Sequence, residues 1–160
     1  MNPIIYAIIL SLTPISELRG GIPVAVAAGY GILFSFVICV VANLLAIPIT
    51  FFFLDYLHKF FMRIDFYKNS FNKFLEKART KIEKSVGEKG QFVALMVFVG
   101  VPLPATGAYT GTLLAWFFNM DRKKAYAAIG LGVLLAGLIV SLVIFFGLKT
   151  LSFLVKNGFV

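Results

Sequence analysis

The sequence predicts an all-α integral membrane protein made of two inverted repeats. Each repeat is a re-entrant helical hairpin followed by a full transmembrane helix, and a basic amphipathic cytoplasmic helix joins the two. Three observations predict this fold: a strongly apolar composition, apolar stretches whose lengths do not fit single crossings, and Pro/Gly-rich breaks in both halves.

The composition is that of a membrane protein. Of the 160 residues, 60% are apolar and 14% are charged, and the mean hydropathy is +0.94. Soluble domains carry about 25% charged residues. The apolar residues form three uncharged stretches, Gly20–Leu54, Gly90–Met120 and Ala125–Leu148. Uncharged runs longer than about 18 residues are typical of membrane-embedded segments.

Several functional classes are disfavoured by the residues present. The single Cys39 excludes an internal disulfide framework, and no Cys/His spacing fits a metal. No histidine, carboxylate pair or activated nucleophile forms a catalytic set, so we expect neither an enzyme nor a cofactor. Met1–Leu12 lacks the basic start of a signal peptide, so we expect it to be retained.

The positive charge is placed where a membrane protein carries it. The formal net charge is +8, and nine Lys/Arg residues lie between Lys59 and Lys89. Arg122, Lys123 and Lys124 follow the next apolar stretch. Short basic loops stay on the cytoplasmic side and meet anionic headgroups. We therefore expect a multi-pass protein of a prokaryotic plasma membrane, with the central loop cytoplasmic and no nucleic-acid partner.

Residues 66–88 predict an amphipathic helix in that central loop. Its apolar residues recur at helical spacing: Phe71, Phe74, Leu75, Ala78, Ile82 and Val86. Lysines and glutamates fill the opposite face. This pattern favours a helix lying on the cytoplasmic membrane surface, and a partner-binding helix is the alternative.

The lengths of the apolar stretches predict the hairpins. Gly20–Leu54 has 35 residues, about 50 Å as a helix, whereas the hydrocarbon core is about 30 Å thick. The second stretch, at 31 residues, is about 46 Å long. Pro and Gly clusters break both stretches into arms that reach about halfway. The expected arms are Met1–Thr13, Val24–Tyr30, Phe92–Val101 and Thr112–Asn119.

The chain is therefore predicted to be one membrane domain, 1–160. Its parts are hairpin 1 (1–30), a transmembrane helix (31–54), the linker (55–90), hairpin 2 (91–120) and a second transmembrane helix (125–148). A shift of 88 residues lays Pro14 on Pro102, Gly20 on Ala108 and Ala27 on Ala115. The charge placement makes the two halves inverted, with hairpins entering from opposite faces.

The first break contains two charged residues. Glu17 and Arg19 are the only charges before Asp55, and charges at membrane depth usually pair or line a pathway. Snorkelling to the interface is the alternative. Residues two apart diverge on a helix, so we expect no direct Glu17–Arg19 bridge. A helix starting within Gly20–Pro23 would add anion-attracting N–H groups.

The second break is uncharged. It offers the hydroxyl groups of Thr106, Tyr109 and Thr110, and Thr106 or Thr110 can cap the returning helix. Tight packing of small residues is the alternative to substrate contact. The predicted transport and binding residues of both breaks are Glu17, Arg19, Gly20, Gly21, Pro23, Pro102, Pro104, Thr106, Gly107, Tyr109, Thr110 and Gly111. Asn43 and Thr50, on one face of the first span, are expected to form interhelical hydrogen bonds.

Segments 17–23 and 102–111 resemble the paired signatures of the putative small multidrug export protein family. That family is distantly similar to the DedA/VTT superfamily, whose members have paired re-entrant hairpins and include lipid scramblases and polyprenyl-phosphate flippases. The resemblance implies that Glu17 and Arg19 are the membrane-embedded transport residues. DedA proteins typically carry an arginine in the second motif as well, whereas residues around Gly107 are neutral here.

The leading functional hypothesis is a transporter or flippase for an amphipathic substrate such as a polyprenyl phosphate. Arg19 would hold the phosphate, and Glu17 would couple transport to protons or sodium. The alternatives are an exporter of cationic drugs and a structural membrane protein without cargo. We also expect a homodimer, with Gly130, Gly132 and Gly137 available for close contact between subunits.

Overall fold

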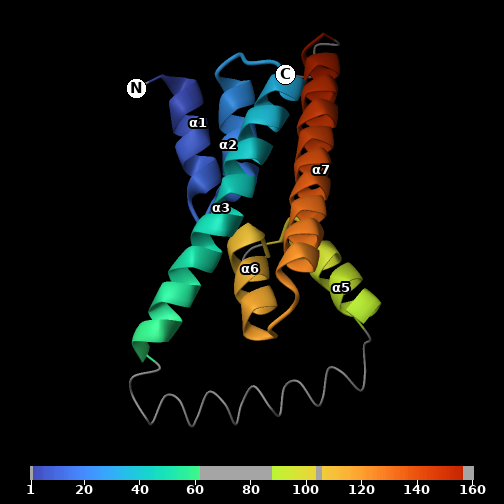
Figure 1. Cartoon of the computed structure of the whole chain (residues 1–160). Coiled ribbons are helices and arrows are strands. Elements are labelled where there is room, and N and C mark those ends of the chain that lie inside the picture. The colour runs from blue at the N-terminus through green and yellow to red at the C-terminus, as the bar shows by residue number, and fades with distance from the viewer. Residues whose placement is uncertain (1, 62–87, 104–105, 157–160) are drawn as a thin grey trace.

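The structure, a computed structural model, describes residues 2–61, 88–103 and 106–156, and these residues form six helices and no strand (Figure 1). The expected all-helical fold is thus confirmed for the described residues. The amphipathic helix expected over 66–88 lies outside them, apart from Glu88, and so does Pro104. The helices are α1 (Pro3–Leu12), α2 (Glu17–Ala27), α3 (Ile32–Phe61), α5 (Glu88–Gly100), α6 (Ala108–Phe117) and α7 (Arg122–Lys156).

Two long helices, α3 and α7, run in opposite directions through the molecule (Figure 1). Their segments Ile32–Leu57 and Arg122–Thr150 are long and apolar enough to cross a membrane. Helix α3 runs past the end of its predicted range of 31–54, and α7 exceeds its predicted range of 125–148 at both ends. The helical backbone continues past the uncharged segment at both ends of the pair, because a helix can run on into the headgroup region, where charged side chains are hydrated.

The four short helices form two pairs at opposite ends of the molecule. The α1–α2 pair lies beside one end of α3 and α7, and the α5–α6 pair lies at the other end (Figure 1). The turn joining α1 to α2 and the segment joining α5 to α6 both lie near the middle. Helix α1 packs chiefly against α2, whereas α5 packs chiefly against α7.

The predicted helix limits need several corrections. Helix α2 starts at Glu17 rather than within Gly20–Pro23, so Pro23 lies inside it. The backbone N–H of Glu17 bonds to the Thr13 carbonyl oxygen at 3.1 Å, and the turn therefore winds directly into the helix. Helix α6 starts at Ala108 rather than Thr112. Consequently Tyr109, Thr110 and Gly111 belong to a helical arm and not to the break.

The interior is built from small residues that let helices approach closely. Alanines on several helices are fully or almost fully buried: Ala7, Ala25, Ala46, Ala108, Ala125, Ala128 and Ala136. A Cβ at Gly132 would meet Val99, and one at Gly137 would meet Phe36. Leu44 similarly neighbours Gly130. These three glycines were expected to be available for close contact between subunits, and in the structure each faces a side chain of the same chain.

The two halves match at positions 90 residues apart. Ala28 and Phe118, which end α2 and α6, have φ/ψ of −80°/4° and −81°/4°. The next residues, Gly29 and Asn119, have positive φ values of 91° and 51°. Burial follows the same register, with Leu18, Gly21, Ile22 and Ala25 matching Ala108, Gly111, Thr112 and Ala115. The expected shift of 88 residues fits only the ends of α1 and α5, Leu12 and Gly100.

Large apolar side chains cover the outside of α3 and α7. Phe52 is 75% exposed and Val143 is 67% exposed. Others are exposed along the same two helices: Leu33, Phe34, Leu45, Ile49, Phe53, Leu142 and Phe146. Soluble monomers rarely expose contiguous apolar surface on this scale, so this surface is suited to contact with lipid.

Gly132→Ala should destabilise the protein, whereas Gly147→Ala should not. Both changes add one methyl group to α7 and bring the same gain in helix propensity. A Cβ at Gly132 would lie 2.7 Å from Val99 Cβ and 2.8 Å from the Met96 carbonyl oxygen, whereas Gly147 has open space. We expect a loss of about 1–3 kcal/mol for Gly132→Ala, measured by unfolding in detergent. Equal stability of the two variants would contradict the α5–α7 packing.

Candidate functional site

The two breaks lie against each other, and the contacts between them involve backbone groups as well as side chains. Residues 13–16 join α1 to α2, and residues 101–107 join α5 to α6. Broken helices leave N–H and C=O groups without helical partners. At membrane depth these groups must find partners in the protein or in a wet cavity. The contacts of Glu17, Arg19 and Tyr109 supply such partners.

Glu17 caps a helix of the opposite pair. Its side chain is almost completely buried, with 6% exposed, and one carboxylate oxygen accepts the backbone N–H of Tyr109 at 3.4 Å. The Ala108 N–H and the Asn43 side chain are also hydrogen-bonding partners of this carboxylate. The N-terminus of a helix attracts negative charge. Glu17 therefore places a carboxylate where α6 has unpaired donors.

Gly107 makes this contact possible. It is the N-cap residue of α6 and provides no capping side chain. A Cβ at Gly107 would overlap the Glu17 carboxylate. The expectation that Thr106 or Thr110 caps α6 is therefore wrong, since a glutamate from the other half of the chain does so. The Thr106 hydroxyl instead donates to the Val101 carbonyl oxygen at 2.8 Å.

Arg19 binds carbonyl groups of the second break. Its guanidinium donates to the carbonyl oxygens of Leu103 and Thr106, and it contacts the Thr106 hydroxyl oxygen at 3.2 Å. Its Nε is buried without a partner. Within the described residues no ion pair joins Arg19 to Glu17. Apart from Arg19 Nε, the partners of both charged side chains are thus mainly backbone groups of the other pair.

Tyr109 makes the reciprocal contact. Its hydroxyl donates to the carbonyl oxygen of Leu12, the last residue of α1. Tyr109 and Arg19 stand 90 residues apart, in the register in which the two halves match. Each side chain donates to a carbonyl group near the end of the opposite pair's first helix. The two contacts are therefore equivalent in position, but one is made by a guanidinium group and the other by a phenol hydroxyl.

A small polar pocket lies at this junction. Its volume is about 10 Å³, which is room for roughly one water molecule. Eight residues from the two breaks and the adjoining turns of α2 and α6 line it: Pro14, Ile15, Ser16, Glu17, Arg19, Thr106, Gly107 and Thr110. In this conformation the site is closed to anything larger than water.

The remaining predicted site residues among those that the structure describes lie outside this pocket. Gly21 and Gly111 serve packing, since a Cβ at Gly21 would overlap the Ser11 hydroxyl and one at Gly111 would overlap Val99. Pro23 lies inside α2, and Gly20 lies one turn beyond Ser16. Pro102 lies in the connecting segment. None of these residues lines the polar pocket.

Asn43 is a site residue that the sequence analysis assigned to interhelical bonding. It is 1% exposed, its side chain interacts with Glu17, and its Oδ1 has no partner. It is the only carboxamide in Ile32–Leu54, which is a signal that sequence reasoning could use. Thr50 forms no interhelical bond in the structure, since its hydroxyl donates to the Ala46 carbonyl oxygen of its own helix at 2.7 Å.

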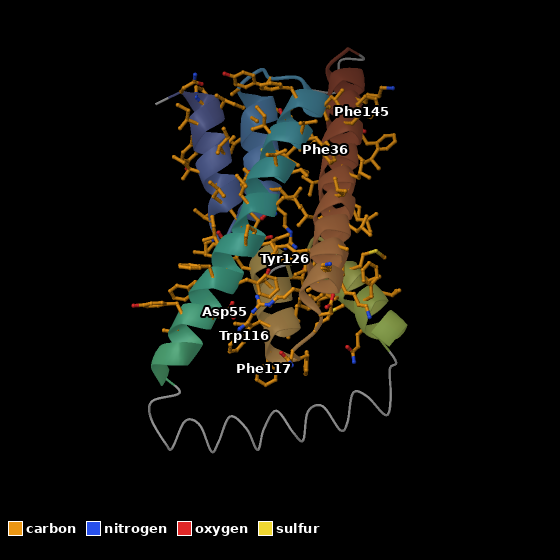
Figure 2. All side chains as sticks on the ribbon, in the orientation of Figure 1. Phe36, Asp55, Trp116, Phe117, Tyr126 and Phe145 are labelled. Atoms are coloured by element: carbon orange, nitrogen blue, oxygen red, sulfur yellow. The ribbon has the colours of Figure 1, made fainter. Side chains whose placement is uncertain are left out.

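A second polar cluster joins α3, α6 and α7 near the end that carries the basic residues (Figure 2). Asp55 pairs with Arg122 at 2.7 Å and accepts the Trp116 indole N–H at 2.8 Å. Arg122 also lies over the Phe51 ring, 4.2 Å from its centre. These contacts tie the second arm of the α5–α6 pair to both long helices.

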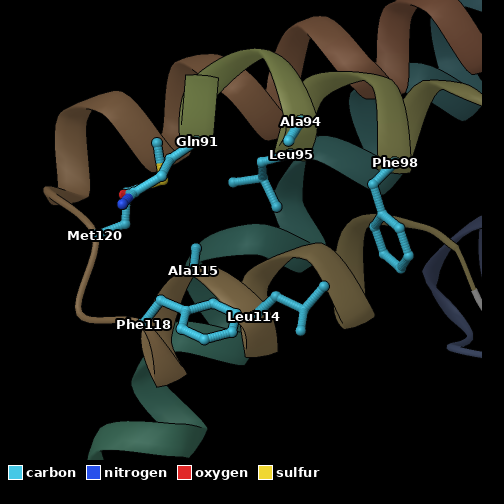
Figure 3. A pocket seen from close by; sticks show the side chains of 8 residues that line it. All are labelled: Gln91, Ala94, Leu95, Phe98, Leu114, Ala115, Phe118 and Met120. Atoms are coloured by element: carbon cyan, nitrogen blue, oxygen red, sulfur yellow. The ribbon is translucent and has the colours of Figure 1, made fainter. Parts of the chain in front are cut away.

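An apolar pocket lies between α5 and α6 (Figure 3). Its volume is about 320 Å³, at the lower end of the range for small-molecule pockets. Its lining is almost entirely apolar: Gln91, Ala94, Leu95, Phe98, Leu114, Ala115, Phe118 and Met120. The pocket exists because α5 packs chiefly against α7 and touches α6 less.

The comparisons with known proteins give the family. The model of the family described as putative small multi-drug export protein matches residues 17–139. The chain belongs to this family, as its two break motifs predicted. No curated protein and no solved structure matches the chain. The match begins directly after the first break, at Glu17, and it includes Arg19, the second break and the pocket residues Thr106, Gly107 and Thr110.

Tyr109→Phe should lower stability, whereas Tyr6→Phe should not. The first change removes the donor to the Leu12 carbonyl group, and the second alters a tyrosine that is 45% exposed on α1. Hydrogen bonds between membrane helices contribute about 0.6 kcal/mol on average and up to about 1.7 kcal/mol. We expect a loss of about 1 kcal/mol for Tyr109→Phe in detergent unfolding. Identical stability of both variants would contradict the reciprocal contact.

Proposed function

We propose that this member of the putative small multi-drug export protein family is a transporter of an amphipathic anion, and that it is not an enzyme. The observation that carries the proposal is the junction of two broken-helix segments around a buried acid and a partly buried base. Broken helices that meet near the midplane form the binding sites of many secondary transporters. Charges held at such a depth are costly and usually serve a pathway.

The helix lengths support re-entrant hairpins. Helices α1, α2, α5 and α6 have 10, 11, 13 and 10 residues, which corresponds to about 15–20 Å each. The hydrocarbon core is about 30 Å thick, so each short helix reaches about halfway. The 90-residue register and the opposite directions of α3 and α7 (Figure 1) support an inverted repeat of such a hairpin followed by a crossing helix.

The electrostatics of the junction favour an anionic group. Arg19 and the N-terminus of α6 both attract negative charge, and they lie on the two sides of one polar pocket. Arginine also binds phosphate through two parallel hydrogen bonds. The apolar pocket between α5 and α6 offers space for part of a hydrocarbon chain. A lipid phosphate such as a polyprenyl phosphate combines both features.

The cellular setting follows from the charge placement. The end of α3, which carries Lys59 and leads into the basic linker of the sequence, and the start of α7, which carries Arg122–Lys124, lie toward the same end of the two helices (Figure 1), and we propose that this end faces the cytoplasm. The membrane is then the plasma membrane of a prokaryote. Two hairpins and two crossing helices make a thin wall around a polar site, so a homodimer is proposed. A proton or sodium ion would drive transport through Glu17.

Export of a cationic drug is the second candidate, and the family description favours it. Glu17 would then bind the cargo. Arg19 lines the same pocket, which lowers the attraction for a cation. Under this alternative Glu17→Gln abolishes drug efflux from cells, while lipid-phosphate flux in liposomes is absent with every variant. A cargo-free structural protein would show neither flux.

Arg19→Gln should abolish flux of a lipid phosphate in liposomes. The change removes the positive charge of the pocket and keeps a polar side chain that can donate hydrogen bonds, although it is shorter than that of arginine. Lys123→Gln removes an exposed positive charge outside the pocket and should retain wild-type flux. We expect a loss of at least about tenfold, measured by a headgroup-accessibility assay. Wild-type flux in Arg19→Gln would exclude the anion-binding role of this residue.

The hairpin topology predicts which residues face each side. In a Cys39→Ala background, single cysteines at Asn2 and Tyr30 should react with an impermeant thiol reagent from the outside. A cysteine at Asp121 should react only from the cytoplasmic side. The results at Asn2 and Tyr30 would be the same if α1 and α2 each crossed the whole membrane, because both ends of the pair would still lie outside. A cysteine at Ile15 distinguishes the two topologies, since two full crossings would expose it to the cytoplasm. Ile15 lies in the first break and should resist the reagent from the cytoplasm.

A further inference from the structure

The polar pocket contains a carboxylate in the place where an anionic substrate would bind. Glu17 occupies the N-terminus of α6, with the N–H groups of Ala108 and Tyr109 as donors. Arg19 lines the same pocket. An incoming phosphate headgroup would require these same donors. We propose that Glu17 is an internal competitor for the anion site, and that the site accepts a singly charged phosphate group only when Glu17 takes up a proton and leaves it.

The charge of the pocket explains why the two occupants exclude each other. With Glu17 ionised, the carboxylate and the Arg19 guanidinium sum to zero. A singly charged phosphate added to this pair would leave one net negative charge at membrane depth, which is unfavourable. A proton on Glu17 restores the sum to zero. One proton is therefore bound for each negative charge that enters.

Asn43 has a free acceptor that can bind the protonated Glu17 side chain. Its side chain is 99% buried, as its 1% exposure shows, and it interacts with Glu17. Its Oδ1 is an acceptor that has no partner in this state. The protonated Glu17 has an O–H group to donate, and a buried acceptor without a donor is costly. Asn43 thus acts as a positioning residue that stabilises the displaced, protonated glutamate.

The surroundings of Glu17 contain few other groups that titrate. Arg19 on α2 and the Tyr109 phenol on α6 are the titratable groups that interact with it. On α3, the Cys39 thiol interacts with Ser11 of α1. Helix α7 has no charged residue from Ala125 to Leu148. A change of anion affinity between pH 5 and pH 8 would therefore report on Glu17.

This inference rests on the transport function proposed above, and anion binding to the purified full-length protein tests it. The probes are dioctanoyl phosphatidylglycerol and dimethyl phosphate, whose single charge is constant over pH 5–8, with dioctanoyl phosphatidylcholine as the zwitterionic control. Wild-type affinity should rise about tenfold per pH unit as the pH falls, since one proton is bound per anion, and should then level off. Asp121→Asn, a matched loss of a carboxylate elsewhere, should follow wild type.

The variants separate the roles of the three residues. Glu17→Gln should bind with the low-pH affinity of wild type at every pH. Arg19→Gln should lose at least about tenfold in affinity at every pH. Asn43→Leu should lower the affinity that wild type reaches at low pH, and it should lower the affinity of Glu17→Gln equally, because the glutamine amide donates to Asn43 Oδ1 as the protonated acid does.

Two results would overturn the inference. One is a wild-type affinity that does not change with pH, which tests the idea even if the variants do not fold. The other is a folded Glu17→Gln protein that binds more weakly than wild type at low pH. The same pattern with dimethyl phosphate supports a site for free anions, and the pattern with phosphatidylglycerol alone supports a lipid headgroup site. Absent flux with this binding pattern would remove the transport function and leave the inference standing.

Discussion

The arrangement of the chain depends on one constraint: the polar groups at the breaks between α1 and α2 and between α5 and α6 need hydrogen-bond partners. The breaks satisfy each other. Glu17 accepts from the N-terminus of α6, Arg19 donates to carbonyl groups beyond α5, and Tyr109 donates to the end of α1. Any of these groups left alone would be a desolvated dipole or charge. The close packing of alanines and glycines along α3 and α7 holds the two breaks in register, so the polar junction and the small-residue interior support one another.

The sequence predicted an all-helical membrane protein correctly because many residues contribute to that prediction. Charge-free lengths, breaks and basic clusters each involve many residues, so an error at one position does not alter the conclusion. The helix starts were less predictable. Pro23 suggested a helix beginning near Gly20, but the turn after Thr13 already winds into α2 at Glu17. Thr106 suggested a local cap, but the cap came from a residue 90 positions away. Local helix-start and capping preferences depend on residues close in the sequence, whereas the cap of α6 was decided by a contact between residues far apart in the sequence.

The candidate site shows the same division. Glu17 and Arg19 could be singled out from sequence because a charge in an apolar stretch is conspicuous. Their partners could not, since these are mostly backbone groups, and any residue carries a backbone. The second break has no charged side chain, so its backbone partners for Glu17 and Arg19 could not be recognised from the sequence. Its glycine at position 107 and its free N–H and C=O groups are the complement of a charged side chain. The matching positions Glu17 and Gly107 are thus both buried but differ in chemistry, since the first provides a charged side chain and the second leaves room for it beside backbone donors.

The backbone at Glu17 has a mechanical meaning. Its φ of 50° lies in the left-handed region, which glycine adopts readily and which costs a glutamate about 1–2 kcal/mol. The position 90 residues later is Gly107, which has an extended φ of −156°. The chain therefore places a side chain where the backbone would be more relaxed without one, and the contacts of the carboxylate hold it there. Once those contacts are lost, the backbone itself pulls toward another conformation. Glu17 therefore both makes the contacts that hold the junction closed and carries the backbone strain that favours its opening.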